Sequence, residues 1–201
     1  MRSLREVVLA RAIAFIATLL VALPVQAQRV SLQTTQGTIL VELAARQAPI
    51  TSANFLRYVD TRKLDGASFF RAARTRGAAT RGFIQGGVRR PYIYQLPPIV
   101  HEPTSRTGLR HVDGTISMAR TAPGTARSNF FITVGAQPGM DAQPGKRGDN
   151  AGFAAFGRVV GGMDVVRRIL AAPPAPNAAR GAMKDQMIAQ PVRIIAARRV
   201  R

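Results

Sequence analysis

The side chains best suited to chemistry lie in two short segments, and none of them is a strong nucleophile. Arg71 follows two phenylalanines, and Gln85 lies in the glycine-flanked run from Gly82 to Gly87. The chain has no cysteine, which excludes a catalytic thiol, a disulfide and a thiolate zinc site. Its two histidines, His101 and His111, are too few to indicate a metal site. A guanidinium, an amide and aromatic rings favour chemistry that works through charge, hydrogen bonding and apolar contact.

A second informative run extends from Gly114 to Ile132. It reads Gly-Thr-Ile-Ser-Met-Ala-Arg, continues through a loop of small residues, and ends in Ser-Asn-Phe-Phe-Ile. With Phe69-Phe70-Arg71 and the Gly82–Gly87 run, this order and spacing resembles the active-site strands of the cyclophilins, the peptidyl-prolyl cis/trans isomerases. The resemblance extends over nearly the whole chain after residue 27. It implies an enzyme that uses no cofactor and no metal, and that acts on Xaa-Pro bonds of proline-containing polypeptides.

The resemblance also implies roles for nine residues. Arg71 would donate hydrogen bonds to the prolyl peptide, a task suited to its fixed fork and permanent charge. Gln85 would orient the guanidinium and bind the substrate backbone. Phe131 would form the floor of the proline slot, with Phe130 facing the core because neighbouring strand residues face opposite sides. The other substrate-binding residues implied are Phe83, Ala119, Arg120, Asn129, Met140 and Phe153, with Ala119 and Arg120 offering their backbone.

The two histidines are predicted to form loop hydrogen bonds instead of taking part in catalysis. His101 and His111 are isolated in segments that flank loops. Rotation about a peptide bond moves no proton, so the reaction implied by the resemblance gives a general base nothing to do.

The segment between Arg71 and Gln85 departs from the family pattern. It is longer than usual, and counting back from Gln85 puts Phe83 on the family's methionine and Gly82 on its phenylalanine. Either Phe83 serves both roles or the pocket has a gap. We predict a loop over Ala72–Arg81, which is rich in glycine, alanine and arginine. This departure leaves open an alternative function, a cyclophilin-fold module or chaperone that binds proline peptides with little turnover.

The elements that must position these residues are mostly short strands. Val30–Thr34 and Thr38–Leu43 alternate in polarity around a glycine turn and predict a β-hairpin. Helices are predicted from Pro49 to about Asp60 and from Met163 to Leu170. Many short strands with one helix near each end predict a mainly β fold, a closed barrel capped at its mouths. The resemblance implies eight antiparallel strands and two helices. Further strands are predicted at Ser68–Arg71, Phe83–Gly87, Thr115–Met118, Asn129–Val134, Ala154–Val159 and Val192–Ala197, the last returning to the first hairpin.

The first 27 residues have the pattern of a secretory signal peptide. Three arginines precede an apolar run from Ala12 to Leu23, and small residues suited to a leader peptidase end at Ala27. The apolar run is shorter than the roughly 20 residues that span a bilayer. We therefore expect cleavage after Ala27, a periplasmic location, and one cyclophilin-like domain over residues 28–201.

The formal net charge of the chain is +19. The leader holds three arginines and one glutamate, so about +17 remains on the rest. Such a charge attracts polyanions. The arginines are scattered, however, and no basic helix or aromatic-interleaved stripe occurs, so no specific nucleic-acid partner is predicted. Weak association with anionic surfaces stays an open alternative. The expected partners are folding envelope proteins, and the expected state is a monomer.

Overall fold

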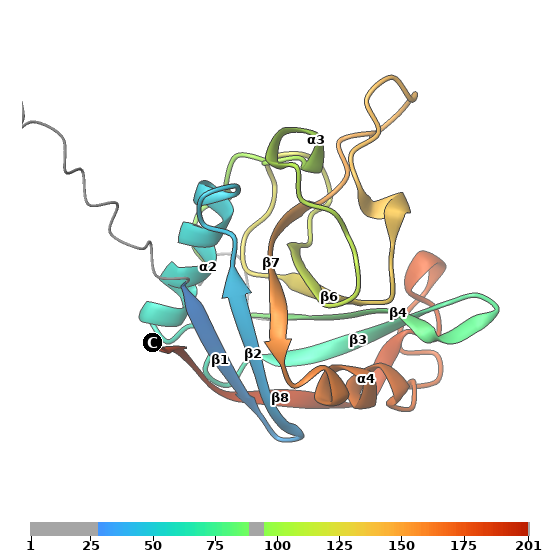
Figure 1. The fold of residues 1–201 in the computed structure, drawn as a ribbon. Helices are drawn as coiled ribbons and strands as arrows, with labels where there is room; N and C mark the ends of the chain where they lie inside the picture. Colours follow the sequence, from blue (N-terminus) through green and yellow to red (C-terminus); the bar gives the residue numbers. More distant parts are fainter. Residues whose placement is uncertain (1–27, 89–94, 201) are drawn as a thin grey trace, which may run out of the picture.

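The computed structural model describes residues 28–88 and 95–200, and within them eight antiparallel strands close into a barrel (Figure 1). The order around the barrel is β1-β2-β7-β5-β6-β4-β3-β8. This confirms the predicted fold class. The predicted signal peptide lies outside the described residues and stays a prediction. The strands are β1 (Arg29–Thr34), β2 (Gly37–Leu43), β3 (Ser68–Thr75), β4 (Ala78–Gly87), β5 (Thr115–Met118), β6 (Phe130–Val134), β7 (Ala154–Gly161) and β8 (Met187–Val200).

Strand β8 closes the barrel, as predicted, but it is 14 residues long and begins earlier than Val192. Its length follows from its two partners. Its first half pairs with β3, where Met187 lies opposite Arg71, and its second half pairs with β1, where Val200 lies opposite Arg29. The end of β8 therefore lies beside the start of β1 (Figure 1). In the part of the chain that the structure describes, closure leaves no long unpaired strand edge around the barrel.

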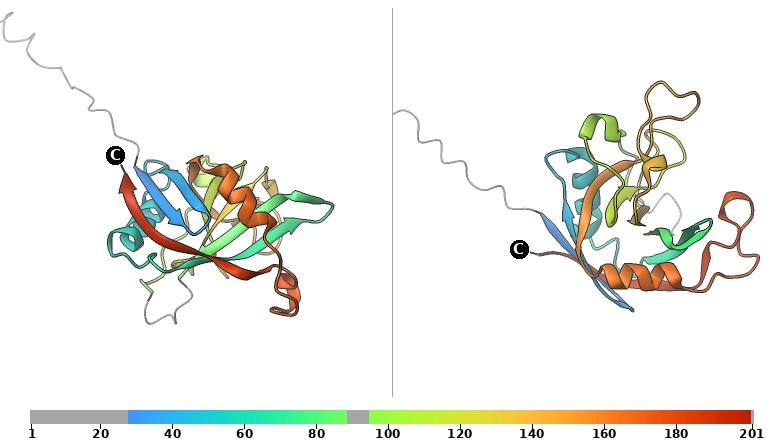
Figure 2. Two further views of the ribbon diagram at one scale, coloured as in Figure 1. Left: turned by 90° about the horizontal axis from the view of Figure 1, so that it is seen from below. Right: turned by 45° about the vertical axis from the view of Figure 1, so that its right-hand side comes forward.

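Both predicted helices are confirmed. Helix α2 (Pro49–Asp60) and helix α4 (Met163–Ala171) lie at opposite ends of the barrel (Figure 2). Three shorter helices escaped prediction because each spans only three or four residues. No helix in the described ranges has the length and apolar character needed to cross a bilayer. The short helices are α3 (Thr104–Thr107), η2 (Pro138–Met140) and η3 (Gly181–Met183).

Aromatic rings fill the barrel interior. Phe55 of α2 packs against Phe130 and Phe156, with ring centroids 5.4 and 5.3 Å apart, and Phe69 packs against Phe130 at 5.7 Å. Two of these contacts are nearly perpendicular, a geometry worth about 0.5–1.5 kcal/mol beyond the buried area. Met118 is also buried in this core. The core therefore fixes the inner faces of β3 and β6, whose outer faces carry the site.

The predicted loop over Ala72–Arg81 is wrong. The stretch instead continues β3 and β4 as a hairpin, with Ala73 opposite Phe83 and a turn at Gly77, where φ is +76°. Alanine, glycine and arginine give no apolar alternation, so nothing local marked these residues as strands. The hairpin is held by Arg74, which donates hydrogen bonds to the carbonyls of Leu170 and Ala172, at 2.9 and 2.6 Å, at the C-terminal end of α4.

Candidate active site

The nine predicted site residues lie around one cavity of about 250 Å³. They come from β3, β4 and β6, from the segments after β5 and before β6, and from the long connection between β6 and β7. The cavity lies on the outer face of the barrel wall, because the inner faces of the same strands belong to the aromatic core. The nine are Arg71, Phe83, Gln85, Ala119, Arg120, Asn129, Phe131, Met140 and Phe153.

Strand register brings the central residues into one row. Arg71 of β3 lies opposite Gln85 of β4, and Gln85 lies opposite Phe131 of β6. A β-bulge at Phe70 shifts the pairing between Phe69 and Arg71. If Phe69, Phe70 and Arg71 alternated regularly, Arg71 would face the barrel interior as Phe69 does, because every second side chain of a strand lies on the same face. The bulge re-aims the guanidinium towards the cavity, a common use of bulges beside active sites.

The guanidinium of Arg71 is held by two amide side chains. Its Nη1 donates to Oε1 of Gln85 at 3.0 Å, and its Nε donates to Oε1 of Gln186 at 2.9 Å. Its central carbon lies 5.0 Å from the centroid of the Phe83 ring. Burial lowers the pKa of Arg71 from its usual value, yet a guanidinium is so strongly basic that the side chain is charged at neutral pH. A fixed positive charge therefore lies at the edge of a partly dry cavity.

Aromatic rings form the apolar part of the cavity. The Phe131 ring lies 5.4 Å from that of Phe83 and 5.3 Å from that of Phe153, the latter nearly perpendicular. Met140 completes the lining on this side. Gly82 contributes no side chain, and glycine is required there because φ is +144° and any Cβ would lie only 2.0 Å from the carbonyl oxygen of Ala73. Of the two pocket positions that the resemblance places on this strand, only Phe83 therefore supplies a ring.

A backbone hydrogen bond between two of the predicted site residues, Ala119 and Asn129, fixes the backbone beside the cavity. The amide nitrogen of Ala119 donates to the carbonyl of Asn129 at 2.9 Å. This bond ties the segment after β5 to the segment before β6. It keeps the backbone of Ala119 at the rim, which is the position that a bound peptide strand would need.

Arg120, which the sequence analysis expects to offer its backbone to a peptide, also has a structural side-chain role that the sequence did not indicate. The guanidinium is almost fully buried, with a side-chain exposure of 4%. It donates to both carboxylate oxygens of Asp149, at 2.5 and 2.8 Å, and to the carbonyl of Gly152. Its central carbon lies 5.1 Å from the Phe153 ring. Arg120 thus fastens residues 149–153 to the cavity wall, and its hydrogen bonds lower the pKa of Asp149.

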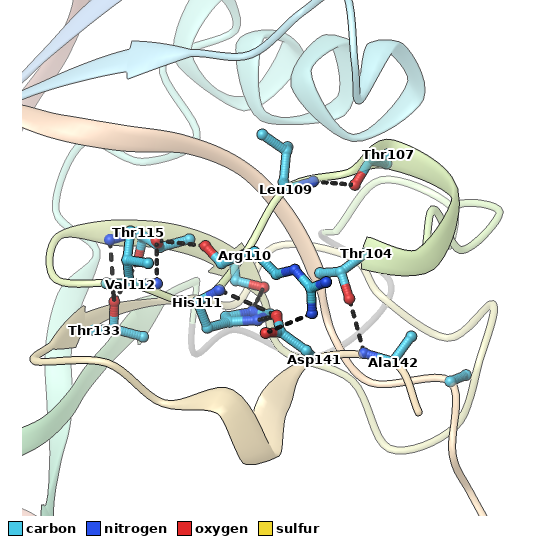
Figure 3. A network of polar contacts seen from close by, with 12 residues as sticks. Thr104, Thr107, Leu109, Arg110, His111, Val112, Thr115, Thr133, Asp141 and Ala142 are labelled. Atoms are coloured by element: carbon cyan, nitrogen blue, oxygen red, sulfur yellow. Dashed lines mark hydrogen bonds and ion pairs between the residues drawn. The ribbon is translucent and has the colours of Figure 1, made fainter. Parts of the chain in front are cut away.

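His111 is buried, with 1% of its surface exposed, and Figure 3 shows it beside Asp141 in a network of polar contacts. Its Nδ1 lies 2.7 Å from Oδ1 of Asp141 and its Nε2 lies 2.9 Å from Oγ of Ser117. Its ring stacks on Phe131 at 5.8 Å. The set resembles a nucleophilic triad, but Ser117 is fully buried and cannot reach a substrate. His111 therefore supports Phe131 by ring stacking, and its hydrogen bonds to Asp141 and Ser117 hold the imidazole in place within a buried loop segment.

Comparison with known proteins accounts for this arrangement. A family model described as "cyclophilin type peptidyl-prolyl cis-trans isomerase/CLD" matches residues 29–199. The chain belongs to the cyclophilin family. It is 34% identical over 170 residues to a peptidyl-prolyl cis-trans isomerase of Acinetobacter baylyi, with 83% of this chain and 82% of that protein covered. It is 38% identical over 144 residues to the isomerase cyp18 of Streptomyces antibioticus, covering 70% of this chain and 81% of that protein.

A solved structure shares the fold of this cyclophilin. The cyclophilin of Cryptosporidium parvum, determined in the presence of the dipeptide Ala-Pro, aligns with a TM-score of 0.66. The alignment covers 87% of this chain and 99% of that one, at 20% sequence identity. At that identity the similarity shows a common fold.

Several residues that line the cavity were not predicted. Those from Thr121 to Arg127 lie in the small-residue loop of the Gly114–Ile132 run, and Ser128 begins its Ser-Asn-Phe-Phe-Ile end, so position in the sequence could have suggested them. Nothing in the sequence marked Met183 and Gln186 as site residues. They follow α4 in a segment without alternation of apolar and polar residues, and they lie more than 100 residues from Arg71. The unpredicted lining residues are Gln95, Thr121, Thr125, Arg127, Ser128 and Met183, and Gln186 joins them through its bond to Arg71.

Protonation of His111 should make this cyclophilin less stable in mild acid. Burial lowers the pKa of His111 below its usual 6.5, against the opposing bond and charge of Asp141. The unfolded chain then takes up the proton at a higher pH than the folded protein, so the free energy of unfolding falls as the pH drops below about 6.5. The slope contributed by one proton is at most about 1.4 kcal/mol per pH unit.

Urea denaturation of the wild type and of His111→Gln at pH 7.5, 6.5 and 5.5 measures this contribution. The variant should be less stable at pH 7.5 because it loses the contacts with Asp141 and Ser117, but its stability should fall less steeply with acid. Parallel pH profiles for the two proteins would contradict the assignment.

Proposed function

We propose that this cyclophilin accelerates cis/trans rotation of Xaa-Pro peptide bonds in proteins that fold in the cell envelope. The observation that carries the proposal is the position of the Arg71 guanidinium beside the rings of Phe83 and Phe131 in one cavity. A proline ring needs an apolar slot, and the bond before it needs a cation that weakens its double-bond character. The site combines both.

The reaction requires no bond cleavage. Amide resonance places a barrier of about 18–20 kcal/mol on rotation of a peptide bond. In the twisted state the prolyl nitrogen becomes pyramidal and regains its lone pair. A hydrogen bond from the Arg71 guanidinium to that nitrogen stabilises the twisted state more than the planar one, which is the requirement for catalysis. Such a hydrogen bond is strongest where water is excluded, and the ring of Phe83, 5.0 Å from the guanidinium, covers part of the Arg71 side chain.

The remaining contacts hold the substrate while its bond rotates. Phe131, Met140 and Phe153 would grip the proline ring, and the backbone around Ala119 would pair with the extended peptide. An acceleration from about 0.01 to about 1,000 per second requires a barrier lower by roughly 7 kcal/mol. One charge-assisted donor supplies about 2.7–4 kcal/mol. Fixing the proline and its neighbours in a preorganised slot would supply the rest.

NMR exchange spectroscopy on an Ala-Pro tetrapeptide tests the activity directly. Catalytic amounts of protein should bring cis and trans signals into exchange on the time scale of seconds or faster, against tens to hundreds of seconds for the free peptide. Unchanged exchange together with measurable peptide binding would favour the alternative, a proline-peptide binding module or chaperone. Unchanged exchange without binding would reject both.

The proposal places the protein in the periplasm, and the support is the signal-peptide pattern of residues 1–27. Expression of the full chain in a Gram-negative host should yield a periplasmic protein that begins at Gln28, as read by mass spectrometry. A chain without residues 1–27 is the control and should stay in the cytoplasm. Full-length protein in the cytoplasmic fraction would contradict the proposal. The high positive charge adds only weak, salt-screened association with anionic surfaces, and we propose a monomer.

A further inference from the structure

The connection between α4 and β8 reaches the active site. In Figures 1 and 2 this segment leaves the end of α4 and runs beside the β3–β4 hairpin. Two hydrogen bonds fix its last residue, Gln186, to β3. The carbonyl of Gln186 accepts from the amide nitrogen of Ala72 at 2.8 Å, and its Oε1 accepts from Nε of Arg71 at 2.9 Å. The backbone bond holds Gln186 in register, so that its side chain meets the guanidinium edge-on.

The two bonds to the Arg71 guanidinium come from opposite parts of the fold. Gln85 on β4 holds Nη1, and Gln186 before β8 holds Nε. Within the described residues, Nη2 makes no hydrogen bond. A planar guanidinium held at two nitrogens cannot swing about its long side chain, so the third nitrogen has a fixed direction. If Gln85 alone held it, the guanidinium could still rotate about the hydrogen bond between Nη1 and Oε1 of Gln85.

Both acceptors are neutral, which matters for the charge of Arg71. Other arginines in the described part of the chain, such as Arg120, Arg198 and Arg199, are bound by carboxylates. No carboxylate in residues 28–88 or 95–200 forms an ion pair with Arg71. Amide oxygens fix the guanidinium without cancelling its charge, whereas a carboxylate at the same place would offset the field that the twisted peptide bond needs.

We propose that Gln186 is a positioning residue for the isomerase, which fixes Arg71 through Nε and leaves its charge and Nη2 available to the prolyl peptide. The inference rests on the proposed function, and it adds a residue from the C-terminal segment to the site. It predicts that catalysis depends both on the presence of an acceptor at position 186 and on its charge. Removing the acceptor should leave the Arg71 side chain mobile. Replacing the amide with a carboxylate should offset the positive charge that acts on the prolyl peptide.

Three variants test the proposal by exchange spectroscopy on the same tetrapeptide. Gln186→Met removes the acceptor at nearly constant volume and should lower kcat about tenfold with little change in KM, because misplacement of a catalytic group by a fraction of an ångström is costly. Gln186→Glu keeps an acceptor and should also lower kcat. Gln190→Met makes the same change at an exposed position of β8 and should match the wild type. Wild-type kcat in Gln186→Met, or in Gln186→Glu, would overturn the proposal.

A second readout does not depend on turnover. The Nε–H proton of Arg71 should exchange slowly with water in the wild type and at least tenfold faster in Gln186→Met, as measured by NMR of arginine labelled with ¹⁵N. Unchanged Nε–H exchange would overturn the positioning role. If the wild type failed to accelerate rotation while the Nε–H exchange responded as expected, the proposed function would fail and the contact would stand. Melting temperatures within about 2 °C of the wild type show that the variants are folded.

Discussion

Arg71→Ala is expected to lower kcat/KM for an Ala-Pro peptide by about 10²–10³-fold. The guanidinium lines the cavity 5.0 Å from the Phe83 ring, and Gln85 and Gln186 hold it there through neutral amide oxygens, whereas the nearby Arg120 is paired with Asp149. Loss of one preorganised donor to a developing charge typically costs about 2.7–4 kcal/mol of transition-state stabilisation. The loss should fall mainly on kcat, because the apolar slot around Phe131 still binds proline. A protease-coupled assay and NMR exchange both measure it.

Two further variants separate the role of Arg71 from general effects of charge. Arg71→Lys keeps the charge but lacks the planar fork, so it cannot satisfy both amides and also reach the substrate, and it should recover only part of the activity. Arg76→Ala removes an arginine at the exposed tip of the same hairpin and should match the wild type. Activity of Arg71→Ala within threefold of the wild type would contradict the mechanism.

The parts of the site that could be predicted follow from local periodicity. Phe130 faces the aromatic core and Phe131 faces the cavity because strand side chains alternate, which requires only that the run is a strand. The hairpin at the start of the chain and both longer helices were predictable for the same reason. The positions of Arg71 and Gln85 came from a family resemblance, and the register that aligns them with Phe131 was not visible in either segment separately.

The unpredicted features depend on contacts between distant residues. The bulge at Phe70 appears only when β3 is paired with its neighbours. The hairpin over Ala72–Arg81 depends on the anchor between Arg74 and the end of α4, about 100 residues away. Gln186 contributes to the site through its hydrogen bond to Arg71, which lies 115 residues earlier in the sequence. Single-sequence patterns record the period of an element, and they do not record which elements will meet, so these features had no local signature.

Helix α2 shows the same limit in its N-terminal cap. Its first turn has no side-chain cap of its own, since Ala48 occupies the capping position and no acidic residue follows. The cap comes from Glu102, which is 2% exposed. One carboxylate oxygen accepts from the amide of Thr51 at 2.8 Å and from its hydroxyl at 2.6 Å, and the other accepts from the amide of Ile50 at 3.2 Å. A residue 51 positions away thus satisfies the free amides of the helix.

Glu102→Ala is therefore expected to destabilise the protein by about 3 kcal/mol. A hydrogen bond to a charged group contributes about 1.5–3 kcal/mol, and the substitution leaves several buried donors without an acceptor. It also removes a negative charge from the positive end of the helix dipole. For a domain of this size the melting temperature should fall by about 6–12 °C. Urea denaturation at pH 7 and calorimetry measure the two quantities.

Comparison with the other glutamate of the described chain isolates the effect of burial. Glu42 pairs with Arg29 and Arg158 at the surface, where ion pairs contribute at most about 1 kcal/mol, so Glu42→Ala should cost much less than Glu102→Ala. Glu102→Gln keeps one oxygen acceptor, loses the charge, and should fall between the two. If Glu102→Ala and Glu42→Ala were equally stable, the cap would contribute no more than a surface ion pair, and α2 would be held mainly by the packing of Phe55 in the barrel core.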